Sequence, residues 1–192
     1  MPRPSLPALA AAVLFTLVSA GAAAAQAYAP SAAAQAKPLP TVQRLERRFL
    51  QIAAANLRFE AEASRLAQDR TNNPAVKDLA STLLSRQQTV QPEMLRLLHV
   101  RGMAPPMPSN RQSKVLKQLG KLNGAKFDRL FVDEVVLTSA QADIANYEKV
   151  AAQAEDPVLK AWAERQLPSL RFSYAKAGKA LPSASLRGQR AV

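Results

Sequence analysis

The sequence of 192 residues contains no cysteine and a single histidine, His99. Without cysteine, the chain has no disulfide framework, no thiolate nucleophile, no Cys-ligated zinc or iron–sulfur cluster and no cysteine for a lipid anchor. With one histidine, metal sites and proton relays that need several histidines are excluded as well. Gly-rich phosphate loops and the Gly-x-Ser-x-Gly nucleophile elbow are also absent. The composition therefore favours a role other than catalysis, and we expect no cofactor.

What is present begins with a segment typical of export. Residues 1–27 combine one positive residue, Arg3, an apolar stretch centred on residues 11–18 and a run of small residues, as secretory signal peptides do. The small-x-small rule is met twice, so we expect cleavage after Ala25 or after Ala27. An uncleaved membrane anchor is the alternative, because residues 8–25 approach the roughly 18–20 apolar residues that cross a bilayer. Since most of these residues are alanine, we favour cleavage and a periplasmic location.

The rest of the chain divides into a linker, one domain and a tail. Residues 28–40 contain three prolines and no helical periodicity, which indicates a flexible linker. Residues 41–181 suit one domain of ordinary size, and residues 182–192 form a basic tail that we expect to be disordered. Cleavage leaves 25 basic side chains, one fewer than the 26 of the whole chain, against 14 acidic ones, so the net charge becomes +11 instead of +12.

Helical periodicity predicts two long helices in the first half of the domain. Apolar residues at alternating spacings of four and three predict a helix from Thr41 to about Thr71; its inward stripe is Leu45, Phe49, Ile52, Asn56, Phe59, Ala63 and Leu66. Asn73-Pro74 supplies a cap and a first-turn proline for the second helix, which Gly102 closes. The inward stripe of that helix is Val76, Ala80, Leu83, Gln87, Val90, Met94 and Leu97, and Pro92 is expected to bend or break it.

Two further long helices are predicted in the second half. Asn123-Gly124 introduces the third, whose buried side we expect to be Phe127, Phe131, Val135, Thr138, Ala142 and Ala145. Asp156-Pro157 opens the fourth, with Leu159, Trp162, Gln166, Leu170, Ser173 and Ala177 inward and a kink at Pro168. A proline-rich crossover over residues 103–110 and a short amphipathic piece over residues 114–122 join helices two and three. The prediction is an all-α four-helix bundle, and its long crossover is analogous to that of ferritin-like bundles.

Four stretches resemble, in order and spacing, the ferritin-like family catalogued as domain of unknown function 4142, whose members are exported bacterial proteins. They are FEAEASRLA (59–67), NPAVKDLASTLL (73–84), GAKFDRLFVDEVV (124–136) and DPVLKAWAERQLPSLR (156–171). Together they account for nearly all of the chain from Phe49 to Lys179. The resemblance implies a ferritin-like four-helix bundle and export.

The resemblance also implies where a site would lie. The family pattern has an inward acidic residue on the first helix, an Asp-His pair on the second, and a histidine on each of the third and fourth. Glu60 matches the acidic residue, but the pair is replaced by Arg86-Gln87, and Ser139 and Ser173 stand where the two histidines would be. These departures imply a bundle without the metal or histidine chemistry of the family.

The helical stripes lead to the same positions without the resemblance. Gln87, Ser139 and Ser173 fall on or beside inward stripes, and Asn56 lies one turn before Glu60. A buried polar group without a partner costs about 1–3 kcal/mol, so we expect these side chains to bond one another or trapped water. They are interpreted either as a polar layer that fixes helix register or as a remodelled site.

A metal site is not predicted. The sequence has no Glu-x-x-His motif, which di-iron carboxylate bundles need twice. His99, near the end of the second helix, is explained by the helix dipole. The alternative is a metal-binding ferritin-like protein or oxidoreductase that uses Glu60 and other carboxylates, such as Asp133 and Glu134.

The basic excess is the remaining signal. The candidate polyanion-binding residues are Arg44, Arg47, Arg48, Lys114, Lys117 and Lys121, with further cations at Arg111, Lys176, Lys179, Arg187 and Arg190. For an exported chain the available polyanions are lipid head groups, lipopolysaccharide and acidic wall polymers, and nucleic acid is not expected. The alternative is that these charges only maintain solubility. The sequence thus predicts a non-catalytic binding or envelope-associated structural protein, with a membrane-anchored form as an alternative.

Overall fold

The computed structural model describes residues 40–181, and they contain helices and connections but no strand, which confirms the all-α prediction. The elements are α1 (Thr41–Arg70), α2 (Pro74–His99), α3 (Asn110–Leu119), α4 (Gly124–Leu130), the π-helix η1 (Phe131–Leu137), α5 (Thr138–Gln153) and α6 (Pro157–Ala180). The predicted signal peptide, residues 28–39 of the linker and the basic tail lie outside the described residues. Within residues 40–181, no helix has the length and hydropathy needed to cross a membrane.

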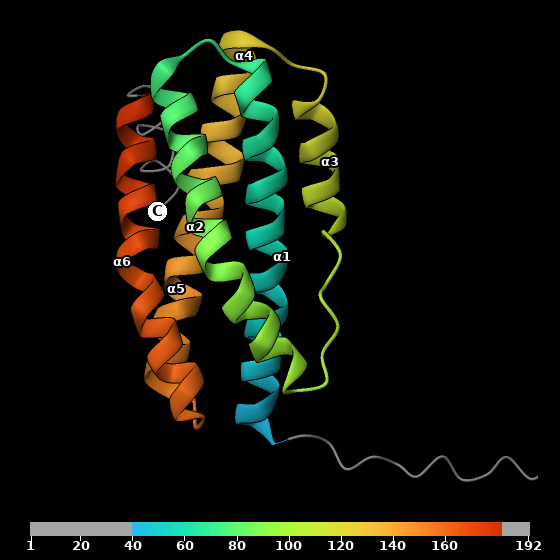
Figure 1. Ribbon diagram of the computed structural model, residues 1–192, viewed down its shortest axis with the longest axis vertical. Helices are drawn as coiled ribbons and strands as arrows, with labels where there is room; N and C mark the ends of the chain where they lie inside the picture. The colour runs from blue at the N-terminus through green and yellow to red at the C-terminus, as the bar shows by residue number, and fades with distance from the viewer. Residues whose placement is uncertain (1–39, 182–192) are drawn as a thin grey trace, which may run out of the picture. The chain divides into compact units, whose positions relative to one another are not determined.

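Four long helical runs lie side by side: α1, α2, α6 and the continuous run of α4, η1 and α5 (Figure 1). The most extensive contacts between helices are those of α5 with α6 and of α1 with α2, and α1 also contacts α5. The short helix α3 lies outside this group against α1, at the end of the long connection from α2 (Figure 1). The predicted order of four long helices, with a crossover between the second and the third, is therefore present.

The helix starts follow from local capping. Asn73 Oδ1 accepts a hydrogen bond from the Ala75 N–H at 2.9 Å, and Asp156 Oδ1 accepts one from the Val158 N–H at 2.8 Å. Gly102, with φ of +60°, forms the turn after α2, where a residue with Cβ would be strained.

The short helix α3 begins four residues before the predicted start at Lys114. The reason is a capping box: the Ser109 hydroxyl accepts from the Gln112 N–H, while Gln112 Oε1 accepts from the Ser109 N–H at 2.8 Å. The Ser-x-x-Gln spacing that marks this start is visible in the sequence.

Neither internal proline breaks its helix. α2 runs on through Pro92 and α6 runs on through Pro168. Both prolines are exposed, and so are Gln88 and Glu164, whose carbonyls lose their helical partner. Because these carbonyls lie on solvent-facing sides, water can satisfy them.

The buried faces of α2 and α6 are those predicted, whereas the face of α1 is broader. Every residue of the two predicted stripes on α2 and α6 is buried. On α1, Leu50, Ala53 and Leu57 are buried, while Leu45, Ile52 and Leu66 of the predicted stripe are only half-buried. α1 contacts α2, α3, α4, η1 and α5, so more of its circumference is covered than a single stripe provides.

The third helical run departs from its prediction after η1. Thr138, Ala142 and Ala145 are exposed, and Ala140, Asp143 and Tyr147 are buried instead. A π-helix bonds residue i to i+5 and so uses one residue more than an α-helical turn. The prediction assumed α-helical spacing throughout, so it selected the wrong face for α5.

The apolar core has two clusters, one toward each end of the bundle. One contains Phe49, Tyr147 and Trp162, with the rings of Phe49 and Tyr147 in edge contact at 4.8 Å between centroids. The other contains the stacked rings of Phe127 and Phe131, 5.8 Å apart, with the valines of η1. Aromatic pairs in such geometries contribute about 0.5–1.5 kcal/mol beyond their burial.

Candidate functional site

A buried ion pair joins α1 to α2. Glu60 Oε2 accepts a hydrogen bond from Arg86 Nη1 at 2.8 Å, and the two side chains are only 4% and 7% exposed. Glu60 follows Phe59 of one core cluster and lies one turn after Leu57 of the other. A charged layer therefore lies between the two apolar clusters.

A second carboxyl, Asp143 of α5, lies in the same interior. Its Oδ1 accepts a hydrogen bond from Asn56 Nδ2 at 2.6 Å, and Asn56 Oδ1 accepts one from Gln112 Nε2 at 2.7 Å. Asp143 belongs to α5, Asn56 to α1 and Gln112 to α3. This chain of hydrogen bonds connects the outer helix α3 to the interior. Glu60, Arg86, Asp143, Asn56 and Gln112 are called the interior cluster below.

Burial dominates the titration of the interior cluster. It raises the pKa of Asp143 from 3.8 to about 7; the nearby Glu60 charge adds to the rise, while Asn56 and Arg86 oppose it. Burial also raises the pKa of Glu60, and Arg86 offsets this in part. For Arg86, the cost of burial is outweighed by Glu60, Tyr147 and Asp143, so its pKa is raised and it stays charged.

The charges of the groups in the interior cluster follow from the directions of these pKa shifts. Glu60 touches the guanidinium of Arg86 and so carries the negative charge, whereas Asp143 accepts from a neutral amide and, with a pKa of about 7, is about half protonated at neutral pH. The buried phenol of Tyr147 also has a raised pKa, caused mainly by its burial, and stays neutral. The charges of Glu60 and Arg86 offset each other, so the net charge of the interior cluster at pH 7 is the partial charge of Asp143.

Four residues stand at positions of the family's site pattern, and they form no hydrogen bond with one another: Glu60, Gln87, Ser139 and Ser173. Gln87 donates to Gln91 on its own helix, Ser139 to the Glu134 carbonyl and Ser173 to the Ser169 carbonyl, so of the four only Glu60 belongs to the interior cluster. Of the two kinds of partner expected for these side chains, direct hydrogen bonds to one another are not formed within residues 40–181. The reason is that hydroxyls within a helix can bond carbonyls of the preceding turn, while Arg86, one residue before Gln87, reaches Glu60.

The residues of the interior cluster do not fit a metal ion. The Glu60 carboxylate is bound by a guanidinium, whose positive charge occupies the place where a cation would have to lie. Within residues 40–181, no three side chains of the His, Asp or Glu type come close enough to share a metal. Glu134 is 2.8 Å from Arg111 in an ion pair, and His99 is exposed as the last residue of α2.

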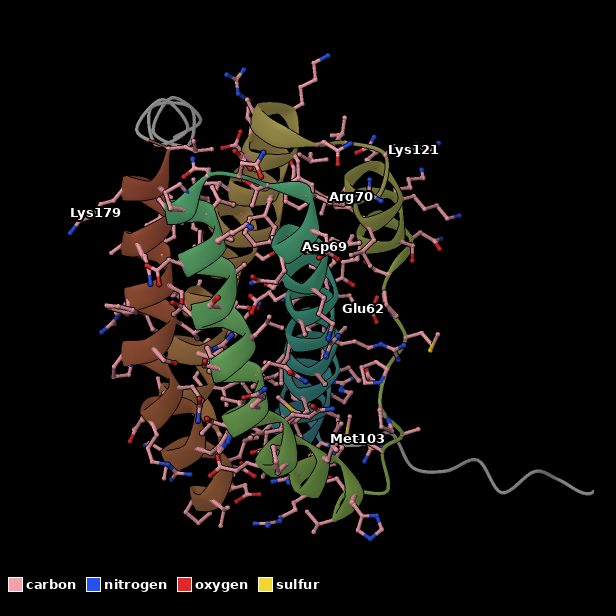
Figure 2. All side chains as sticks on the ribbon, turned by 45° about the horizontal axis from the view of Figure 1, so that its top comes forward. Glu62, Asp69, Arg70, Met103, Lys121 and Lys179 are labelled. Carbon is pink, nitrogen blue, oxygen red and sulfur yellow. The ribbon has the colours of Figure 1, made fainter. Side chains whose placement is uncertain are left out.

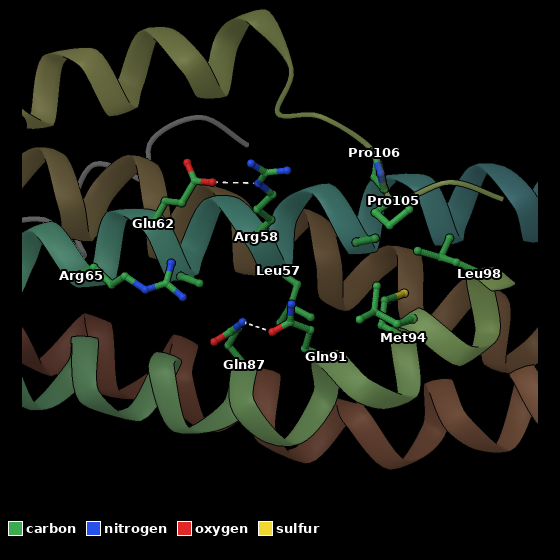
Figure 3. A pocket seen from close by; sticks show the side chains of 13 residues that line it. Leu57, Arg58, Glu62, Arg65, Gln87, Gln91, Met94, Leu98, Pro105 and Pro106 are labelled. Atoms are coloured by element: carbon green, nitrogen blue, oxygen red, sulfur yellow. Dashed lines mark hydrogen bonds and ion pairs between the residues drawn. The ribbon is translucent and has the colours of Figure 1, made fainter.

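A groove of about 400 Å³ lies between α1 and α2 and includes Gln87 (Figure 3). Its apolar part contains Met94 and Leu98, beside Pro105 and Pro106 of the connection that follows α2. Its polar part contains the hydrogen-bonded Gln87 and Gln91 and the ion pair of Arg58 and Glu62, at 2.8 Å. The groove thus presents charges of both signs.

The candidate polyanion-binding residues fall into two separate groups. Arg44, Arg47 and Arg48 lie near the start of α1, whereas Lys121 lies beside Arg70, the last residue of α1 (Figure 2). At 1.5 Å per residue, the 22 residues from Arg48 to Arg70 place Lys121 on the order of 30 Å from the first group. Lys114 lies nearer, because it follows Gln112, which hydrogen-bonds Asn56 of α1, by two residues. Lys114 and Lys117 lie on α3 and Lys121 lies in the turn that follows it, and all three lysines are exposed.

The three arginines of the first group have different surroundings. The Arg47 guanidinium donates to the carbonyl of Arg101 at 2.8 Å and so ties α1 to the turn after α2. Arg44 and Arg48 instead line a surface hollow of about 670 Å³ together with Lys149 of α5. Leu45 and Ile52 form part of its apolar wall. We call this site, formed by Arg44, Arg48, Lys149, Leu45 and Ile52, the basic hollow.

The fold defines an all-α helical-bundle protein with a buried charged layer and a basic surface hollow. The chain matches the model of the family described as domain of unknown function (DUF4142) over residues 28–180, and it belongs to that family. No curated protein and no solved structure matches the chain. The resemblance noted in the sequence is thereby confirmed at the level of the family.

The positions of the site residues are more predictable from the sequence than their partners are. Asp143 and Lys149 were not predicted as site residues, because both positions depend on the face that α5 turns inward after η1. The pairing of Arg86 with Glu60 was also missed. An arginine directly beside an inward stripe position, with one inward glutamate on the neighbouring helix, is a signal that would have suggested it.

Proposed function

We propose that this protein is an exported helical-bundle protein that binds anionic components of the cell envelope and does not act as an enzyme. The observation that carries the proposal is the state of its exposed cations. Within residues 40–181, Arg44, Arg48 and Lys149 have no carboxylate within 4 Å, and Lys114, Lys117 and Lys121 have none either. Such cations are free to attract an anionic surface.

The interior supports the non-catalytic part of the proposal. Glu60 is bound by Arg86, and Asp143 is held by Asn56 within the protein. A general acid or base must reach a substrate proton, whereas these carboxyls are only 3% exposed at the level of the residue. The interior cluster is therefore better explained as a layer that sets the packing of α1, α2 and α5.

The test is co-sedimentation of the exported form with lipid vesicles. We expect association with vesicles that contain phosphatidylglycerol and none with phosphatidylcholine alone. Raising the salt from about 0.1 M to about 1 M shortens the Debye length from about 10 Å to about 3 Å and should release the protein. Equal binding to both vesicles, or binding that salt leaves unchanged, would contradict the proposal.

The export part is tested separately by N-terminal sequencing of the protein recovered from the periplasm. We expect the mature chain to begin at Gln26 or Tyr28, directly after the two proposed cleavage points. Recovery of the intact N-terminus in the membrane fraction would instead favour the membrane-anchored alternative. That result would leave the proposed binding of anionic components untouched.

A further inference from the structure

The basic hollow differs in charge from three other hollows lined by residues 40–181. The groove between α1 and α2 contains Glu62 beside its arginines. A hollow beside α3 contains Arg111 with Glu134, and one on α4 contains Lys126 and Arg129 with Glu134 and Asp133. The lining of the basic hollow includes three cations and no carboxylate. Of these four hollows, it is the one with an uncompensated positive field.

The three cations of the basic hollow come from two helices that pack against each other. Arg44 and Arg48 are one turn apart on α1, and Lys149 lies on α5, which contacts α1. The Arg44 guanidinium has one internal partner, the Thr41 hydroxyl at 3.2 Å, and no hydrogen bond within residues 40–181 occupies Arg48 or Lys149. Other exposed arginines are used internally: Arg171 pairs with Glu148 at 2.7 Å.

The wall between these cations is apolar. Leu45 and Ile52 are half-buried, and Phe49 and Val150, which also line the hollow, are buried in the core. Arginine recognises phosphate oxygens through paired N–H donors, and lysine adds a point charge. An apolar wall beside phosphate-binding cations suits a ligand whose phosphate is attached to hydrocarbon.

We propose that the basic hollow binds the phosphate of an anionic phospholipid head group, with Arg44, Arg48 and Lys149 on the phosphate and Leu45 and Ile52 against the adjoining carbons. This inference rests on the proposed function and deepens it, because it assigns the attraction for anionic surfaces to one site. Lys114, Lys117 and Lys121, which line none of these four hollows, contribute only to the general field. A membrane surface is chosen over free phosphate because the volume of about 670 Å³ and the apolar wall exceed the needs of a lone ion.

The test compares two triple variants of equal charge change in the exported form. One carries Arg44→Gln, Arg48→Gln and Lys149→Gln; the control carries Lys114→Gln, Lys117→Gln and Lys121→Gln. We expect the first to weaken binding to phosphatidylglycerol vesicles about a hundredfold, the loss typical of three cations removed from an anionic surface. The control should lose less than about tenfold, since its residues lie outside the site. Unchanged thermal unfolding in both variants shows that the fold is intact.

Two further arms separate the possible outcomes. Ile52→Gln keeps the charge and should weaken vesicle binding at low salt, because it removes apolar contact; unchanged binding would mean that the apolar wall does not contact the lipid. Inorganic phosphate, titrated while the backbone amide NMR signals of residues 44–52 are followed, should compete only weakly with vesicles. If phosphate alone saturates the hollow tightly, the site is for soluble phosphate and the lipid assignment is wrong.

The outcomes also distinguish this inference from the proposed function. Equal losses in the two triple variants would overturn the assignment to the basic hollow while leaving attraction to anionic surfaces in place. Failure of the unmodified protein to bind anionic vesicles at all would overturn the proposed function itself.

Discussion

The interior cluster and the basic hollow both gather charged side chains, yet they satisfy them in opposite ways. In the interior, Arg86 is enclosed and touches Glu60 at 2.8 Å, and each carboxyl has a partner from the protein. In the hollow, Arg48 and Lys149 are exposed and have no carboxylate partner among residues 40–181. A buried charge must be paired to be tolerated, whereas a hydrated one can remain unpaired and available. The interior charges therefore bear on stability, and the hollow charges on binding.

The comparison is tested most strongly by removing one guanidinium from each region. Arg86→Met leaves the Glu60 carboxylate buried without its partner, and we expect it to lower the free energy of unfolding by about 3–5 kcal/mol. Arg48→Gln in the hollow should change it by no more than about 0.5 kcal/mol. Urea unfolding at pH 7 measures both values.

A double variant, Glu60→Gln with Arg86→Met, serves as the control, because it removes both charges. It should recover a large part of the loss. If Arg86→Met unfolds within about 1 kcal/mol of the unmodified protein, the interior pair does not have the role assigned to it.

The second test concerns the pH dependence of stability. Because the pKa of Asp143 is about 7 in the folded protein and 3.8 is its ordinary value, the folded state holds an extra proton between these values. The stabilisation is complete below about pH 4 and is lost as the pH rises through 7, so the free energy of unfolding should fall over this range. Asp143→Asn keeps an oxygen for Asn56, and at pH 8 we expect it to stabilise the protein by on the order of 2–4 kcal/mol.

The matched control for this test is Asp69→Asn, which changes an exposed carboxyl of α1. Thermal or urea unfolding from pH 4 to pH 8 should show a flatter profile for Asp143→Asn than for the unmodified protein or the control. The same slope in all three would show that Asp143 does not hold the extra proton.

The smallest expected effect is at the junction of the interior cluster with α3. Gln112→Ala removes the donor to Asn56 Oδ1 and the capping-box acceptor of the Ser109 N–H, and we expect a loss of about 1 kcal/mol together with faster hydrogen exchange of the α3 amides. Gln118→Ala, at an exposed position of the same helix, is the control and should leave exchange unchanged. Equal exchange in the two variants would mean that the hydrogen bonds of Gln112 do not hold α3 in place.

Much of the fold was predictable because its signals are local. Asn73-Pro74 and Asp156-Pro157 mark helix starts by capping, and the stripes of α2 and α6 kept α-helical spacing throughout. The buried face of α5 was not predictable in this way, because nothing in the segment FVDEVVL indicates a π-helix. For the site, Glu60, Arg44 and Arg48 came from the sequence, whereas their partners Arg86 and Lys149 depend on how separate helices meet.

The π-helix η1 has a consequence that joins the two regions. It sets the phase of α5, which gives Asp143 to the interior cluster and Lys149 to the basic hollow. Since each residue of an α-helix advances by about 100°, one residue deleted between Phe131 and Leu137 would turn α5 by that angle. Asp143 and Lys149 would then leave their sites together. The composition of both charged regions therefore depends on this one seven-residue segment.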